Sequence, residues 1–405
     1  KKIKQKEVNF CKFYNPSDDS LIDEGILLVF PSPNSFTGDD LAEFHVHGSN
    51  AVITYFLKVL SEQPNCRLAE PGEFTKIAFQ NNKIDLVEAE SIADLIHSET
   101  ELQRQQAVKL VQGKASNYYN NLRERLIKSL AYIEAQIDFA EEDLPDSVLH
   151  QTQDTIHQVC VDIKQILNDH NIGEKIREGF RVSITGEVNA GKSSLLNLLA
   201  KRDLAIVSEE EGTTRDVIEA YLNIDGYPVI LADTAGIRES TNEVEKKGIL
   251  LAINKSKESD LNLIVIDNSS TKINKTIQNL INENTIVVLN KSDIKSDHKH
   301  NFNKAILVSV KENKNIDKLI TQIKEKLSKK FITSNNILVT RERHRTKLKD
   351  CLQEIENFLK KDQNKDIEIR AEDLRRATRH LGAIVGKVDV EEILGSIFKD
   401  FCVGK

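Results

Sequence analysis

The sequence predicts a multidomain protein that combines α/β and all-α parts, because its texture changes three times along 405 residues. Residues 1–70 mix short apolar runs with Pro and Gly, which is typical of a small α+β domain. Residues 71–178 have a helical pattern that returns over 336–405, and residues 179–335 alternate strand and helix patterns between them. We therefore expect a helical bundle with an inserted α/β domain whose sheet is mostly parallel.

The N-terminal domain is predicted from its apolar runs and turn residues. The run 26–30 ends at the turn sequence PSPN (31–34), and a second apolar run, 51–53, follows the His47-Gly48 pair. Apolar runs bounded by Pro and Gly are typical of a small α+β unit. This segment is therefore expected to form a core of its own.

The helical parts are predicted from apolar residues at helical spacing. Between 71 and 171 the only glycines are Gly72 and Gly113. Two stripes recur every three to four residues, and we expect both to be core rather than a ligand site. They are Leu122, Leu126, Leu130 and Ile133, and Ile156, Val159, Ile163 and Ile166.

The α/β domain is predicted from short apolar runs that alternate with helical stretches. Such alternation is typical of a parallel sheet covered on both faces. The expected strands are 181–184, 228–231, 261–266, 285–289 and 305–308. The expected helices are 192–202, 240–257, 273–283 and 314–328.

Composition excludes several protein classes. With 56 basic and 63 acidic residues the net charge is −7, which argues against a protein that coats DNA through general positive charge. The sequence contains no run of 18 apolar residues, so we expect no membrane span. Its first residues show no basic stretch followed by an apolar one, so nothing in them indicates secretion. The five scattered cysteines form no C-x-x-C pair, which favours a reducing, cytoplasmic location.

The segment GEVNAGKS (186–193) lies between a predicted strand and a predicted helix, and it satisfies G-x-x-x-x-G-K-[ST]. In that context the glycines let the backbone wrap phosphates and direct N–H groups at them. Lys192 is expected to reach the β- and γ-phosphates, and the Ser193 hydroxyl to bind Mg²⁺. The pattern predicts a nucleoside triphosphate site.

The next predicted strand ends in DTAG (233–236). There Asp233 is expected to hold Mg²⁺ through water and Gly236 to meet the γ-phosphate. Upstream, in GTTRD (212–216), Thr214 is the expected first-switch ligand of Mg²⁺. Ile237 stands where many GTPases have a water-orienting Gln, so hydrolysis must use another residue or a group from a partner.

Two further strand ends predict recognition of the base. In NKSD (290–293), Asp293 can accept both N–H groups of guanine, which adenine does not offer in that arrangement. In SVK (309–311), Ser309 is expected to lie behind the guanine base and support it. Because the carboxyl ends of parallel strands meet at one edge of a sheet, the motifs together predict a GTP site.

The segments that carry these motifs resemble those of the MnmE (TrmE) family of tRNA-modification GTPases, and the resemblance covers essentially the whole chain. The similar segments are NAGKSSLLN (189–197), GTTRD (212–216), DTAGIRE (233–239), NKSD (290–293), PNSFTGDD (33–40), HVHG (45–48), PGEFTKIAFQNNKIDLVEAESIADLI (71–96) and FCVGK (401–405).

The resemblance implies a homodimer with a tetrahydrofolate-binding N-terminal domain, a helical domain and an inserted P-loop GTPase domain. It implies that the protein acts with the flavoprotein MnmG on the wobble uridine of certain tRNAs. The product would carry an aminomethyl-type group at C5, made from the one-carbon unit of a methylene-tetrahydrofolate.

The resemblance also implies site residues. Potassium would complete the site when two GTPase domains meet, and its expected ligands are Asn189, Ser208, Glu210 and Thr213. Glu245 matches the position of the family's catalytic acid, and Asn189 is the second residue that is expected to promote hydrolysis. Cys402 matches the family's C-terminal cysteine. The expected magnesium ligands are Ser193, Thr214 and Asp233. The expected nucleotide contacts are Gly186, Asn189, Ala190, Gly191, Lys192, Ser193, Ser194, Thr213, Thr214, Asp233, Gly236, Asn290, Lys291, Asp293 and Ser309.

The chain departs from the family pattern in three places. Glu187-Val188 stands where relatives usually have a residue followed by Pro, and the loop 208–211 is unusually acidic. The chain contains no Met, and the resemblance begins partway into the first domain, so part of the folate pocket is expected to lie outside this sequence. Asn34, Thr37 and His47 are the remaining candidates for lining that pocket.

Two alternative functions stay open from the sequence. One is a non-enzymatic switch GTPase that binds RNA or the ribosome, and the other is a one-carbon folate enzyme with a regulatory GTPase domain. For tRNA contact the sequence offers two basic clusters, although solvated helix faces are the better explanation for most of their residues. They are Arg341, Arg343 and Arg345, and Arg375, Arg376 and Arg379.

Overall fold

The computed structural model forms two compact units, and each is described by itself. One unit comprises Lys1–Ala93, Leu110–Ile156 and Glu354–Lys405, and the other comprises Asp94–Lys109 and His157–Gln353. The residues that the structure describes are 3–138, 146–187, 189–201, 219–233, 258–270, 275–295, 302, 304–331, 337–362, 367–388 and 397.

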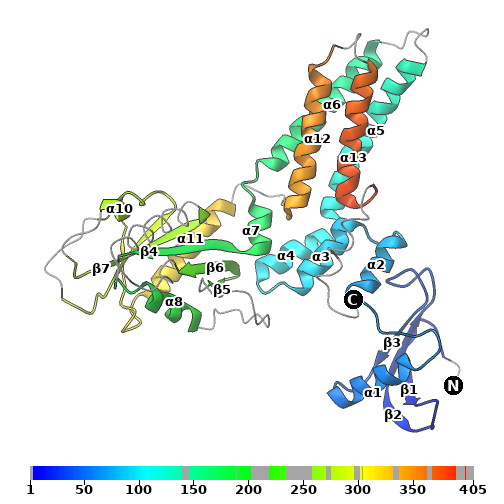
Figure 1. The fold of residues 1–405 in the computed structure, drawn as a ribbon, viewed down its shortest axis with the longest axis horizontal. Helices are drawn as coiled ribbons and strands as arrows, with labels where there is room; N and C mark the ends of the chain where they lie inside the picture. Colours follow the sequence, from blue (N-terminus) through cyan, green and yellow to red (C-terminus); the bar gives the residue numbers. More distant parts are fainter. Residues whose placement is uncertain are drawn as a thin grey trace, which may run out of the picture. The chain divides into compact units, whose positions relative to one another are not determined.

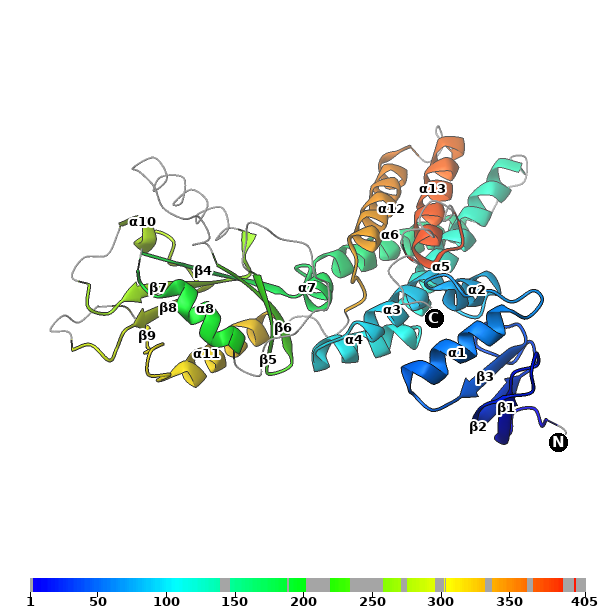
Figure 2. The same cartoon turned by 60° about the horizontal axis from the view of Figure 1, so that its bottom comes forward.

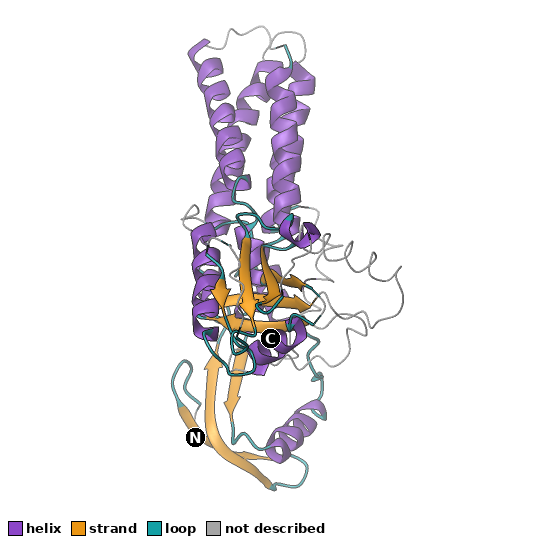
Figure 3. Cartoon of the chain, turned by 90° about the vertical axis from the view of Figure 1, so that its left-hand side faces the viewer, coloured by secondary structure: helices purple, strands orange, loops and turns teal. Residues whose placement is uncertain are grey.

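The N-terminal part of the first unit is an antiparallel sheet with a helix, which agrees with the predicted α+β class (Figure 3). The strands pair in the order β1 (Asn9–Tyr14), β2 (Leu21–Phe30), β3 (Leu41–His45), and α1 follows as Asn50–Ser61. One face of the sheet packs on α1 through the rings of Phe13, Phe44 and Phe56, whose centroids lie 5.2–5.6 Å apart. Two of these contacts are edge-to-face and the third is tilted, and together the rings form a small aromatic cluster.

Long amphipathic helices make up the helical part, and α5 and α13 pack side by side (Figure 1). The predicted stripe on α5 is largely buried, which confirms that it is core. Among the described residues, no helix is long and apolar enough to cross a membrane. The helices are α2 (Glu73–Gln80), α3 (Leu86–Ile96), α4 (Glu101–Val111), α5 (Lys114–Asp138), α6 (Asp146–Leu167), α12 (Glu342–Lys360) and α13 (Ile367–Val385).

The second unit contains a six-stranded sheet of order β5-β6-β4-β7-β8-β9, in which only β5 is antiparallel to its neighbour. The predicted mostly parallel sheet is confirmed. Its strands are β4 (Phe180–Gly186), β5 (Glu219–Ile224), β6 (Tyr227–Asp233), β7 (Leu261–Asp267), β8 (Thr285–Asn290) and β9 (Ile306–Leu307).

Strand β5 was not predicted, although the sequence holds a signal for it. Asp225 and Gly226 both have positive φ, at 49° and 92°, and they join β5 to β6 in a tight hairpin. Asp-Gly between two strands is typical of such a turn. The hairpin adds an antiparallel edge strand to the parallel sheet.

Helices cover both faces of this sheet (Figure 2). One face is covered by α7 (Ile172–Glu178), α8 (Lys192–Lys201) and α11 (Ile316–Phe331), whose apolar residues join one core with β4, β6, β7 and β8. On the other face lies α10, which is only Lys275–Gln278 where a helix over 273–283 was predicted. The predicted helix 240–257 lies outside the described residues.

Candidate nucleotide site

The loop after β4 approaches its neighbours so closely that two of its residues must be glycine. A Cβ on Gly186 would lie 2.0 Å from the carbonyl oxygen of Val265, and one on Gly191 would lie 2.3 Å from the amide nitrogen of Asn290. Both glycines have positive φ, 148° and 95°. The loop therefore turns tightly over the sheet edge and leads directly into the N-terminus of α8, where the N–H groups and the helix dipole favour an anion.

Lys192, the first residue of α8, folds its ammonium group back over this loop. Its Nζ donates hydrogen bonds to the carbonyl oxygens of Gly186, at 3.1 Å, and Glu187, at 2.7 Å. The positive charge thus lies at the mouth of the loop, where phosphates would bind. The unusual Glu at position 187 does not disturb this contact, because Lys192 binds the backbone carbonyl of Glu187 and not its side chain.

Asn290 ties the end of β8 to the phosphate loop. Its Nδ2 donates to the Ala190 carbonyl oxygen at 2.9 Å, and its Oδ1 accepts from the Val310 N–H at 3.1 Å. The side chain is buried, so both bonds are shielded from water. Asn290 was predicted as a nucleotide contact, but its side chain joins three loops of the protein.

Asp293 and Ser309 meet across the base end of the site. The Ser309 hydroxyl donates to Oδ1 of Asp293 at 2.6 Å. This hydrogen bond is the main reason that the pKa of the Asp293 carboxyl lies below its usual value, and Lys311 and Lys291 add to the effect. Asp293 is therefore held ionised, as an acceptor for the two N–H groups of guanine requires.

Asp267 is a site residue that the sequence reasoning missed. It ends β7 in register with Asn290 on β8, and its carboxylate accepts from Lys291 Nζ at 2.6 Å. Burial alone would raise the pKa of Asp267, but hydrogen bonds from Lys291 and Ser269 outweigh it and the pKa is lowered. The signal was available, since an Asp at the end of a buried strand marks this edge of a parallel sheet.

The structure brings together the following predicted residues at one sheet edge: Gly186, Asn189, Ala190, Gly191, Lys192, Ser193, Ser194, Asn290, Lys291, Asp293 and Ser309. Asp233 ends β6, opposite Ile184 on β4. The remaining predicted residues lie outside the described part of the chain: Ser208, Glu210, Thr213, Thr214, Gly236, Glu245 and Cys402.

The basic cluster considered for tRNA contact differs from a solvated helix face. Arg345 is almost completely buried between Glu174 and Asp169. Arg341 contacts Asp94 at 2.7 Å and is only 17% exposed. Neither guanidinium is available to bind a phosphate backbone, so the suggested tRNA contact through Arg341 and Arg345 is wrong.

The other basic cluster is paired on the surface. Arg375 contacts Glu134 and Glu372, and Arg376 also contacts Glu372. These pairs reduce the charge that the arginines present to RNA.

The N-terminal candidates for the folate pocket lie in two separate settings. His47 Nδ1 contacts Asp23 on β2 at 2.9 Å, and its backbone N–H donates to the same carboxylate at 2.8 Å. Thr37 is buried, and its carbonyl oxygen accepts from Asn81 Nδ2 at 2.9 Å. Asn34 lies in the turn after β2, where its N–H donates to the Pro31 carbonyl oxygen.

Two family models match the chain: "GTP-binding protein TrmE N-terminus" over residues 1–83 and "MnmE helical domain" over residues 86–402. The tRNA modification GTPase MnmE of Pelagibacter ubique is 58% identical over 95% of this chain and 88% of its own length. The chain belongs to the MnmE family. The MnmE of Rickettsia bellii is 42% identical over 100% of this chain and 92% of its own length.

Membership of the MnmE family identifies the chain as a tRNA modification GTPase and supports GTP binding. Solved structures align only in part. A GTP-binding protein from Sulfolobus solfataricus covers 64% of this chain at 15% identity with a TM-score of 0.28. The assignment to MnmE therefore comes from the sequence comparisons.

Proposed function

We propose that this chain hydrolyses GTP and, with the flavoprotein MnmG, installs an aminomethyl-type group at C5 of the wobble uridine of tRNA. The one-carbon unit would come from a methylene-tetrahydrofolate. Similarity to MnmE proteins over nearly the whole chain supports tRNA as the substrate. The observation that carries the GTP part is the Asp293–Ser309 bond at the same sheet edge as Lys192.

The phosphate end of the proposed site has two functions. Lys192 and the N–H groups at the start of α8 bind the β- and γ-phosphates, and Gly236 meets the γ-phosphate. Ser193, Thr214 and Asp233 are the proposed magnesium ligands. Their hydroxyl and carboxylate oxygens are the hard donors that Mg²⁺ takes, and Ser193 directly follows Lys192 on the first turn of α8. Mg²⁺ held there would supply positive charge to offset the charge of the phosphates.

In the proposed hydrolysis a water oxygen bonds to the γ-phosphorus while the bond from that phosphorus to the β–γ bridging oxygen breaks. The electron pair stays on the bridging oxygen of GDP, and the water's hydrogens end on inorganic phosphate and solvent. Glu245 orients the attacking water through a second water, which Ile237 cannot do.

Potassium is the proposed second cation. Asn189, Ser208, Glu210 and Thr213 would hold it, and its positive charge would favour cleavage of the bond to the β–γ bridging oxygen. Asn189 fits this role because its side chain is exposed, on a backbone with φ of 62° directly before the buried Ala190. An amide oxygen is a suitable ligand for such a cation.

The folate and tRNA chemistry is assigned to other parts of the chain. Asn34, Thr37 and His47 are proposed to line the folate pocket, and Cys402 to serve the modification reaction through its thiol. We further propose a cytoplasmic homodimer whose two GTPase domains meet when GTP is bound. The predicted domain boundaries, 1–70, 71–178, 179–335 and 336–405, are kept as part of this proposal.

Two measurements test the GTPase mechanism. Hydrolysis should be faster in potassium chloride than in sodium chloride, and Glu245→Ala should bind GTP but barely hydrolyse it. Glu325→Ala is the matched control, because Glu325 lies exposed on α11. Equal rates in the two salts, or a Glu245→Ala protein as active as the control, would contradict the mechanism.

The wobble nucleoside of tRNA from cells that lack the protein separates the candidate functions. Loss of the aminomethyl-type group, with recovery when the chain is restored, supports the modification enzyme. Unchanged tRNA would favour the switch GTPase that binds RNA or the ribosome. Unchanged tRNA with altered one-carbon folate pools would favour a folate enzyme with a regulatory GTPase domain.

A further inference from the structure

Helix α7 is a short element that leads directly into the strand below the phosphate loop. Its seven residues, Ile172–Glu178, are followed by Gly179 and then by β4, which ends at Gly186. Ile172 and Ile176 are buried in the same core as β4 and α8. Because its apolar face is part of the sheet's core, α7 should move with that sheet as one body.

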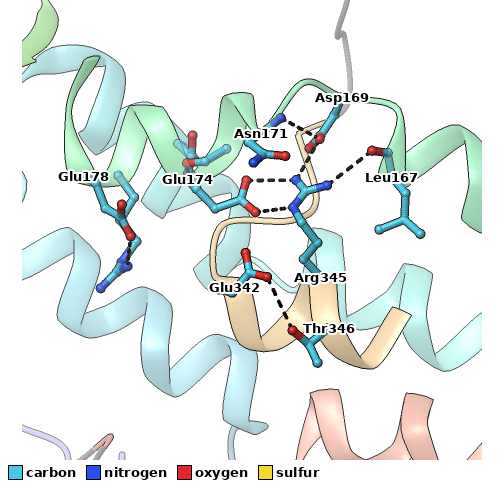
Figure 4. Close-up of polar contacts among 11 residues, drawn as sticks. Leu167, Asp169, Asn171, Glu174, Glu178, Glu342, Arg345 and Thr346 are labelled. Atoms are coloured by element: carbon cyan, nitrogen blue, oxygen red, sulfur yellow. Dashed lines mark hydrogen bonds and ion pairs between the residues drawn. The ribbon is translucent and has the colours of Figure 1, made fainter. Parts of the chain in front are cut away.

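The polar face of α7 is held by Arg345 on the first turn of α12 (Figure 4). The guanidinium donates to both carboxylate oxygens of Glu174, with Nε···Oε1 at 2.6 Å and an Nη···Oε2 distance of 3.0 Å. It also donates to Asp169 at 2.7 Å and to the Leu167 carbonyl oxygen at 3.2 Å. The side chain of Arg345 is 3% exposed, so this two-point contact is shielded from water.

A second ionic contact holds the same helix. Arg177 Nε donates to Oδ1 of Asp94 at 3.0 Å, and Arg341, just before α12, contacts the same oxygen at 2.7 Å. One carboxylate thus joins α7 to the segment that begins α12. Together with Arg345, it restrains both ends of the short helix.

The backbone of α7 is equally restrained. The Gly173 carbonyl oxygen accepts from Gln106 Nε2 at 3.1 Å. A Cβ on Gly173 would lie 1.8 Å from the Val339 carbonyl oxygen, so the two backbones are in direct contact. On the sheet side, Lys175 contacts Asp260 at 2.8 Å, and Asp260 accepts from the Arg181 N–H at the start of β4.

This arrangement is more specific than stability requires. A buried ion pair stabilises a fold no better than apolar residues of similar size, because both charges lose their hydration. What a two-point guanidinium–carboxylate contact adds is a fixed relative orientation. A displacement of β4 would therefore reach the first turn of α12, which continues as one helix to Lys360.

We propose that α7 and Arg345 form a mechanical coupling that passes the nucleotide state of the phosphate loop to α12. Arg345 is thus a positioning residue: it contacts no substrate, and it acts through Glu174. Its role in tRNA modification rests on the proposed function, whereas the coupling itself can be measured without tRNA.

The test compares Arg345→Lys with the parent chain. Lysine keeps the positive charge but has no fork, so it cannot hold Glu174 and Asp169 in fixed geometry. Arg104→Lys is the matched control, because Arg104 pairs with Glu101 in an exposed contact on α4. Amide hydrogen exchange over residues 342–350 is measured with and without a non-hydrolysable GTP analogue.

In the parent and the control, the analogue should change exchange over 342–350. In Arg345→Lys that change should be lost, while GTP affinity and hydrolysis stay within about twofold of the parent. The proposal is overturned if the parent shows no change, if Arg345→Lys responds like the parent, or if GTP affinity or hydrolysis falls as far as the response does.

A second variant is needed in case Arg345→Lys does not fold, which thermal unfolding would reveal. Arg177→Lys keeps the ion pair between Arg341 and Asp94, and the side chain that it replaces is 30% exposed. This variant should therefore fold. It should weaken the nucleotide response in the same direction, and an unchanged response there also counts against the coupling. If the parent fails to modify tRNA, the proposed function fails, while the exchange comparison still decides the coupling.

Discussion

Asn290 and Ala190 are 100 residues apart in the chain and joined by a hydrogen bond of 2.9 Å. Through this bond the end of β8, which carries the base-recognition motif, supports the loop that carries the phosphate motif. The same side chain accepts from the Val310 N–H beside the third motif. One buried amide therefore keeps the base and phosphate ends of the site in register.

Asn290→Ala should weaken GTP binding by about 5- to 150-fold, because losing a buried partner of this kind costs about 1–3 kcal/mol. Titration calorimetry with GTP measures it. Asn120→Ala on α5 is the control, since it removes an amide that accepts from Lys387 far from this loop in the sequence. An unchanged affinity for Asn290→Ala would mean that the loop holds its shape without the amide.

Asp293→Asn should change which base is bound. The carboxylate accepts two N–H groups of guanine, whereas an amide offers one acceptor and one donor. GTP affinity should fall at least about tenfold, and xanthosine triphosphate, which has an oxygen in place of the amino group, should bind more tightly than GTP. Competition between the two nucleotides measures the change. Retained preference for GTP would remove Asp293 from base recognition.

Ser309→Ala should shift the acid limit of GTP binding to higher pH. The Ser309 hydroxyl lowers the pKa of Asp293, and without it that pKa should return toward the ordinary value of 3.8. A lowered carboxyl pKa contributes stability that is complete above the unfolded-state pKa and is lost as pH falls through the folded-state pKa. GTP affinity measured from about pH 7 down to about pH 3 should therefore fall earlier in the variant. Coincident curves would contradict this.

Gly173→Ala should destabilise the second unit. The new Cβ would lie 1.8 Å from the Val339 carbonyl oxygen, and the backbone of α7 must move to relieve that contact. Overpacking of this kind costs about 1–3 kcal/mol of unfolding free energy. Gly48→Ala makes the same change where nothing lies within 4 Å, and it should be neutral or slightly stabilising. Chemical denaturation measures the unfolding free energy of both variants. Equal values would show that the backbone of α7 can move away from Val339 at no cost, which would contradict the prediction.

Much of the fold could be predicted because it depends on local pattern. The alternating runs around β4, β6, β7 and β8 mark buried parallel strands, and all four are found where expected. Strand β5 was missed although Ala220, Leu222 and Ile224 alternate with more polar residues and the Asp225-Gly226 turn marks the hairpin. Helix α7 was missed because seven residues are too few to show a helical period.

Side-chain partners were harder to predict than strands. Arg341 and Arg345 look like a basic surface cluster in the sequence, because nothing local shows that Asp94, Asp169 and Glu174 lie against them. These pairs join segments up to 247 residues apart. Charge patterns along one helix describe its own surface and say nothing of which element covers it.

By itself the sequence determined the family and predicted the order of the domains and the residue types of the proposed GTP site, because motif spacing and periodicity are properties of the chain. The tertiary structure decided which side chains meet. It placed Asn290 against Ala190 and Lys291 against Asp267, and it turned Arg345 from a surface cation into the buried partner of Glu174. The physical reason is that hydrogen bonds and ion pairs depend on distance in space, which for segments far apart in the chain is set only when the elements pack.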